Sequence, residues 1–224
     1  MLHLGSIGKT SIDVDFSFFI LIGLFVILNY DESKGIEYAL IWIPILFISV
    51  LFHEFAHAAA IALFGFGGSN IVLGGMGGHT SNENMRNARP WQDVVISIAG
   101  PASNFLLAMI CSYFYLNTRI GGTDKMLIVL LPTMGKISIW WGLLNLIPVP
   151  PLDGGHATRS FFRMFLTDRT SFVISTWIAL IVGGAIALWG FRGGQFFLAF
   201  FLVMMLFGVW QRWQYFREHG IPGD

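Results

Sequence analysis

Six apolar runs determine what this chain can fold into, because each is close to the length that a lipid bilayer requires. They cover residues 14–30, 39–64, 94–117, 127–149, 172–190 and 194–210. A membrane-spanning helix needs about 20 predominantly apolar residues. The sequence therefore predicts an all-α polytopic membrane protein with about six transmembrane helices, folded as a single domain over residues 1–224.

The composition supports a membrane protein and excludes other classes. Charged residues make up 12% of the 224 residues and hydrophobic residues 55%. Soluble domains carry about 25% charged residues, so the lipid bilayer is the expected surrounding. The formal net charge is zero, which gives no reason to expect a nucleic-acid partner. The single cysteine, Cys111, can form no intramolecular disulfide, and we expect a small core side chain.

Lysine and arginine predict the orientation, because they are enriched in short cytosolic loops. The N-terminal residues lack the basic region and cleavage site of a signal peptide, so we expect the first run to be retained. With a cytosolic N-terminus, eight basic residues lie in cytosolic segments: Lys9, Arg86, Arg89, Arg159, Arg163, Arg169, Arg212 and Arg217. Four lie in external segments: Lys34, Arg119, Lys125 and Arg192. The distribution favours a multi-pass cell-membrane protein with both termini in the cytosol.

The second run contains three ionisable side chains, His53, Glu54 and His57. A carboxylate at the centre of a bilayer costs at least about 2.5–3.5 kcal/mol, so such residues are usually functional. Residues four apart share one face of a helix, which lets two imidazoles bind one zinc ion while Glu54 takes a proton from a nearby water. The alternative is a pair of core histidines bonded to neighbouring helices, but it leaves Glu54 without a role in lipid.

A catalytic zinc site needs a third protein ligand. By residue type the candidates are His79, Glu83, Asp153 and His156. Asp153 stands out because three prolines precede it in the segment NLIPVPPLDGG at 145–155. Prolines cannot continue a regular helix, so the backbone must open there, and Gly154 and Gly155 then allow a sharp turn. Open backbone at membrane depth must be buried or line a cavity, where it can carry a ligand. The alternative is a proline-rich loop in which Asp153 caps a helix.

Three motifs together resemble a known family. They are H-E-F-A-H at 53–57, A-G-P-A-S-N at 99–104 and N-L-I-P-V-P-P-L-D-G-G at 145–155. With them, the chain resembles the site-2 protease family of intramembrane zinc metalloproteases, in a compact form with no room for a PDZ or CBS domain. The resemblance covers a three-helix catalytic core of about residues 39–170.

The resemblance implies one zinc ion per chain, held by His53, His57 and Asp153, with Glu54 as the general base. It implies that Asn145 donates to the scissile carbonyl or its oxyanion. For Asn104, a similar role and a plain bond between helices stay equally open. We expect His79 and His156 not to be ligands.

The resemblance also implies the substrate, which is a transmembrane helix of another protein, often a membrane-bound regulator. Recognition would then lie in the membrane domain or in a regulatory membrane partner. Residues 65–78 contain seven glycines and are expected to form a short extended, membrane-associated segment. Ile71, Val72 and Leu73 would be an edge strand that pairs with the unwound substrate. A flexible loop is the alternative.

The predicted function is therefore regulated intramembrane proteolysis by a zinc metalloendopeptidase. The alternative from another class is a transporter that carries protons or metal ions on the intramembrane His, Glu and Asp groups. It would need access from both membrane faces, and nothing in the sequence suggests inverted repeats. A zinc-binding regulator without activity is a second alternative, against which the intact Glu54 argues.

Overall fold

The computed structural model describes residues 1–33, 35–121 and 125–220. Its elements in chain order are β1 (Leu2–Ile7), β2 (Thr10–Val14), α1 (Phe16–Leu28), α2 (Ile36–Leu40), α3 (Trp42–Leu63), β3 (Asn70–Gly74), β4 (Gly77–Ser81), the 3-10 helix η1 (Glu83–Asn87), α4 (Pro90–Gly121), α5 (Lys125–Asn145), α6 (Asp153–Arg163), α7 (Asp168–Arg192) and α8 (Phe196–His219). They form two compact units. The first comprises residues 1–85 and 99–142, and the second comprises 86–98 and the chain from 143 onward.

Five helical segments in the described part of the chain are long and apolar enough to cross a membrane. They are Ile36–Leu63, Pro90–Asn117, Met126–Asn145, Asp168–Arg192 and Phe196–His219. The first of the six predicted spans differs, because α1 has 13 residues. At 1.5 Å per residue it is about 20 Å long, less than the bilayer's hydrocarbon core of about 30 Å. The described residues thus contain five segments of sufficient length and one short apolar helix, where the sequence predicted about six spans.

In the first unit, the four strands form one sheet in the order β1-β2-β3-β4. β2 and β3 run parallel, with Ser11 opposite Asn70 and Val14 opposite Leu73, and the other two pairs are antiparallel. The N-terminal hairpin of β1 and β2 was not predicted from the sequence. Its signal was present, because two alternating segments flank Gly8, whose positive φ of 61° suits a tight turn.

The predicted strand at Ile71, Val72 and Leu73 is confirmed as part of β3, but its predicted position at a sheet edge is wrong. β3 pairs with β2 on one side and with β4 on the other, so its backbone groups are already used. The physical reason is that β2, from the chain's N-terminus, occupies the edge that the prediction left open. Among the described strands, the two edges are β1 and β4.

Two apolar clusters hold the first unit together. The sheet packs on α1 and α3 through side chains that include Val14, Phe18, Val50 and Ile71. The helices α3, α4 and α5 pack through Ile45, Leu107, Cys111 and Met134. Cys111 is buried there as a small core side chain, as predicted. The three helices that carry the motifs thus share one apolar core.

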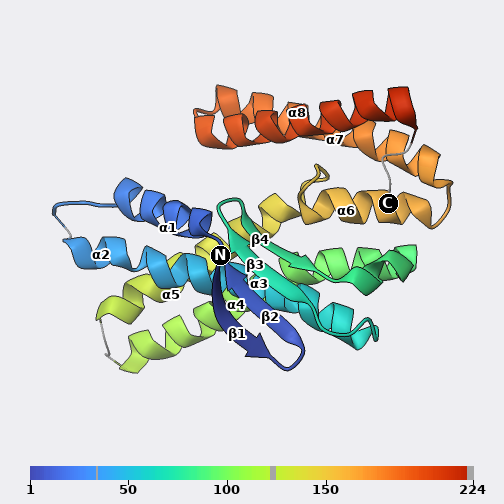
Figure 1. The fold of residues 1–224 in the computed structure, drawn as a ribbon. Helices are drawn as coiled ribbons and strands as arrows, with labels where there is room; N and C mark the ends of the chain where they lie inside the picture. Colours follow the sequence, from blue (N-terminus) through green and yellow to red (C-terminus); the bar gives the residue numbers. More distant parts are fainter. Residues whose placement is uncertain (34, 122–124, 221–224) are drawn as a thin grey trace. The chain divides into compact units, whose positions relative to one another are not determined.

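In the second unit, α6 packs on α7, and α7 lies alongside α8 (Figure 1). A small core of Val149, Leu152, Ala179, Met205 and Val209 joins them. α5 ends at Asn145, and the chain up to Leu152 is irregular, as the prolines predicted.

The two glycines that follow Asp153 have a different role from the predicted one. Gly154 and Gly155 lie inside the first turn of α6 rather than in a sharp turn. A Cβ on Gly155 would collide with the backbone nitrogen of Pro150, and one on Gly154 with the carbonyl of Leu146. These glycines therefore allow the irregular segment to pack against the start of α6.

Candidate metal centre

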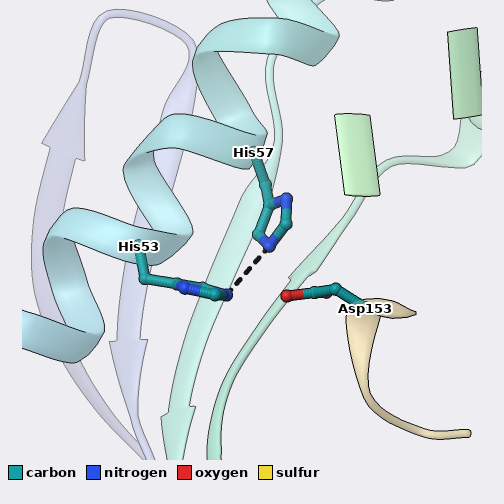
Figure 2. A group of neighbouring side chains, drawn as sticks. All are labelled: His53, His57 and Asp153. Atoms are coloured by element: carbon teal, nitrogen blue, oxygen red, sulfur yellow. Dashed lines mark hydrogen bonds between the residues drawn. The ribbon is translucent and has the colours of Figure 1, made fainter. Parts of the chain in front are cut away.

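His53 and His57 lie one turn apart on the same face of α3, and both side chains are buried. Their rings meet edge to face with centroids 4.7 Å apart, and the two Nε2 atoms are 3.1 Å apart (Figure 2). The 3.6-residue period of the helix produces this convergence directly from the sequence spacing. The first two predicted ligands are therefore brought together within the first unit.

Asn104 on α4 determines which ring nitrogen of His53 faces His57. Its side chain is fully buried, and its Oδ1 lies 3.2 Å from His53 Nδ1. An amide oxygen can only accept a hydrogen bond, so Nδ1 carries the proton and Nε2 presents a lone pair. This is the interhelical bond predicted as one of two roles for Asn104, and it is directed at a ligand in the way that metal sites orient their histidines.

The geometry of the two imidazoles suits a zinc ion. Two nitrogens bound to one tetrahedral zinc at 2.0–2.1 Å stand about 3.3 Å apart. The observed separation of 3.1 Å is close to that value. In the structure the two Nε2 atoms are close enough to share a hydrogen bond. Metal binding to histidine displaces such protons, so a zinc ion could take the place of the shared proton.

Gly100 on α4 leaves the space in which the two imidazoles converge. A Cβ at this position would lie 2.5 Å from His53 Nε2 and closer still to His57 Nε2. Any other residue would therefore enter the volume in front of the two Nε2 atoms. The glycine of the motif at 99–104 is a steric requirement of the histidine pair, which the sequence analysis did not recognise.

Glu54 is buried and is held by the edge strand β4. Thr80 Oγ1 donates a hydrogen bond to Glu54 Oε2 at 2.7 Å and lies 3.2 Å from the Glu54 carbonyl oxygen. A Cβ on Gly78 would collide with the Glu54 side chain, so the strand can approach only because this residue is glycine. Thr80 and Gly78 are candidate site residues that were not predicted from the sequence. The two-residue period that places both on one face of a strand was their only signal.

The same alternation directs His79 away from Glu54. His79 lies between Gly78 and Thr80 on β4 and is exposed. Its neighbours face Glu54, so the imidazole projects from the opposite face of the strand. That His79 is not a ligand stays a prediction.

The remaining predicted site residues belong to the second unit. Asp153 is the first residue of α6 and is half-buried, and it is drawn with the two imidazoles in Figure 2. Asn145 is the last residue of α5 and is also half-buried. His156 is exposed on α6 and lines a pocket with Arg159. Both motif residues therefore flank the irregular segment that the prolines create.

Comparison with known proteins gives one family. Peptidase family M50 matches residues 38–120 and 121–189. A Synechocystis sp. protein named "Putative zinc metalloprotease sll0528" is 29% identical over 204 residues, which are 81% of this chain and 52% of that protein. A zinc metalloprotease from Methanocaldococcus jannaschii is 28% identical over 193 residues, 85% of this chain and 47% of the relative. The chain thus spans about half the length of these curated relatives.

The fold also matches a solved structure. The site-2 protease from Methanocaldococcus jannaschii superposes with a TM-score of 0.64 and 23% sequence identity. The match covers 94% of each chain. At this identity it supports the shared fold, an all-α polytopic arrangement with a short strand segment.

Proposed function

Because the chain belongs to peptidase family M50, we propose that it is a zinc metalloendopeptidase that cleaves within or near transmembrane segments of other membrane proteins. The convergence of the His53 and His57 Nε2 atoms at 3.1 Å, beside a buried Glu54, is the observation that carries this proposal. The chain is a multi-pass membrane protein, and its described residues include five helical segments long enough to span a bilayer.

His53, His57 and Asp153 would hold the zinc ion. They are the group of imidazole and carboxylate side chains that could bind one metal ion in the described part of the chain. Two histidines and one carboxylate are a known ligand set of catalytic zinc in proteases. A zinc ion held there would supply Lewis-acid chemistry, polarising the scissile carbonyl and lowering the pKa of an attacking water.

Glu54 would act as the general base. It accepts a proton from the attacking water and then donates it to the leaving amine. Thr80 holds one carboxylate oxygen, Oε2, by a hydrogen bond of 2.7 Å, which leaves Oε1 to take the proton. Asn145, at the end of α5, would donate to the oxyanion that develops on the scissile carbonyl.

The substrate would be a transmembrane helix that is locally unwound, because a regular helix shields its own peptide bonds. An unwound segment in lipid needs new partners for its backbone groups. β4 is the sheet edge whose strand contacts Glu54, so we transfer to it the pairing role predicted for Ile71–Leu73. The Nδ2 atom of Asn104 is buried without a hydrogen-bond partner among the described residues. This amide nitrogen is therefore available to donate a hydrogen bond to the substrate as well.

We also propose the orientation with both termini in the cytosol, and one observation bears on the N-terminal part of it. β2 lies at the N-terminus and pairs with β3, which follows the C-terminal end of α3. The N-terminal segment and the 70–81 segment therefore lie on the same side of the membrane. His57 is six residues before the end of α3. At 1.5 Å per residue the metal would lie about 9 Å inside that end of the helix.

The comparisons give no support for the transporter alternative. The proposal also includes a membrane-bound regulator as the substrate and a regulatory membrane partner. It further includes a single domain over residues 1–224. The decisive test is co-expression of the wild type and Glu54→Gln with tagged candidate membrane proteins. Products that appear with the wild type and not with Glu54→Gln, at equal zinc content, are expected. Identical products from both would refute proteolysis by this site.

A further inference from the structure

Lys136 is a basic residue near the middle of α5, and the proposed function gives it no role. Within the span Met126–Asn145 it lies ten residues from the first residue and nine from the last. At 1.5 Å per residue these separations are about 15 and 14 Å, which is close to the centre of a hydrocarbon core of about 30 Å. A lysine near a helix end can extend to the interface, but its four-carbon stem is too short at this depth. Lys136 therefore needs a partner within the membrane.

The structure places Lys136 on the face of α5 that points away from α3 and α4. The opposite face is packed, because Met134 belongs to the core shared by the three helices and the Ser138 hydroxyl lies 3.2 Å from a serine hydroxyl of α3. Lys136 is exposed, and so are Ile139 and Trp140. Residues three and four apart are neighbours on a helix surface. These three residues thus form one outward surface, the Lys136 face.

No carboxylate of this chain serves as the partner in the structure. Among the described residues, Lys136 makes neither an ion pair nor a side-chain hydrogen bond. The other two members of the Lys136 face are apolar, so they do not line a polar cavity around the ammonium group. The positive charge is therefore presented outward, towards whatever packs against this face of α5.

A second copy of the chain does not offer a suitable carboxylate either. Of the acidic residues in the five long spans of the described chain, only Glu54 lies more than four residues from a span end. Glu54 is buried and accepts a hydrogen bond from Thr80, so it cannot reach a neighbouring molecule. The other acidic residues of these spans are Glu37, Asp93, Asp168 and Glu218. The complementary charge must therefore come from a different protein.

We propose that the Lys136 face binds a transmembrane helix of another protein that carries an aspartate or glutamate near its middle. A carboxylate complements the ammonium group at a depth where either charge alone is costly. Trp140, which is 66% exposed, adds a large apolar surface one turn along the helix. A helix without the acidic residue would leave Lys136 unpaired, so the charge selects the partner. The inference concerns binding and does not rest on the zinc site or on proteolysis.

The test measures the binding of designed transmembrane peptides to the full chain in phosphatidylcholine liposomes. Each peptide is a leucine–alanine helix of about 20 residues with one glutamate or one glutamine at its centre and a dansyl group at one end. Energy transfer from the eight tryptophans of the chain to the dansyl group reports binding. We expect the glutamate peptide to bind saturably and at least about tenfold more tightly than the glutamine peptide, the value of one hydrogen bond between charged groups.

Variants of the chain assign this preference to one side chain. Lys136→Met should bind the glutamate peptide no more tightly than the glutamine peptide. Arg192→Met is the matched control, because it removes one positive charge from the end of a different span, α7, and should keep the tenfold preference. Lys136→Glu should prefer a peptide with a central lysine over the glutamine peptide. That reversal would show that the variant folds and that the Lys136 face itself makes the contact.

Three results would overturn the proposal. The first is equal binding of the glutamate and glutamine peptides to the wild type, and the second is an unchanged preference in Lys136→Met. The third is a dimer of the wild type, detected by chemical cross-linking without peptide, that Lys136→Met abolishes, because the occupant would then be a second copy. Zinc content is recorded for every variant, so a failure here is distinguishable from a failure of the proposed protease.

Discussion

Replacement of Gly100 by alanine tests the metal centre at its tightest point. The added Cβ would lie 2.5 Å from His53 Nε2 and closer to His57 Nε2, whereas ordinary contacts begin at 3.4 Å. The His53 ring must therefore recede by about 0.9 Å, the difference between these two distances, and the His57 ring by more. Zinc–nitrogen bonds tolerate deviations of only about 0.2 Å, so both ligands cannot stay in place.

We expect the Gly100→Ala variant to bind zinc at least about 100-fold more weakly than the wild type, the upper range for disturbed residues around a metal. Helix propensity cannot explain such a loss, because alanine is favoured over glycine within a helix by about 0.8–1.0 kcal/mol. The assay is competition with a fluorescent zinc chelator, with total zinc measured by atomic emission. Thermal unfolding of the metal-free protein shows whether the fold itself has changed.

Gly184→Ala in α7 is the matched control. Gly184 is also a helical glycine, but a Cβ there meets nothing within 4 Å. The Gly184→Ala variant should therefore bind zinc with the same affinity as the wild type. If Gly100→Ala also kept wild-type zinc affinity, the imidazoles would not converge in front of α4, and the account of the site would be refuted.

Three further predictions concern the ligands, the base and the topology. Asp153→Ala should lose zinc and activity, whereas Glu54→Gln should keep zinc and lose activity; full zinc in Asp153→Ala would contradict the third-ligand assignment. Thr80→Val should lower kcat by about tenfold, the loss of one hydrogen bond to a charged group, with KM and zinc unchanged. Thr80→Ser should restore kcat, and failure to do so would limit the threonine to a packing role. In a cysteine-free background, Asn84→Cys should be labelled by an impermeant thiol reagent from the cytosolic side and Gly194→Cys from outside. Labelling of both from one side would refute the proposed orientation.

The parts of this site that the sequence predicted are those set by local geometry. The spacing of His53 and His57 is enough to place them on one helical face, because the helix period is fixed. The three prolines that precede Asp153 are enough to end a helix. Gly100 gave no such signal, because its importance lies in the approach of α4 to two side chains on α3. That approach depends on tertiary packing, which no short-range pattern encodes.

The error at β3 shows how a distant segment changes the expected chemistry. The sequence indicated a strand at 71–73 but did not indicate its partner, β2. In that pairing Ser11 lies opposite Asn70, which is 59 residues later in the chain. Once β2 occupies that side, β4 becomes the open edge, and β4 also carries Thr80, which holds Glu54. In the proposed mechanism one strand therefore aligns the substrate backbone and positions the general base. An extended segment paired with β4 would lie beside the carboxylate that must act on it, whereas a helix that stays wound could not pair there.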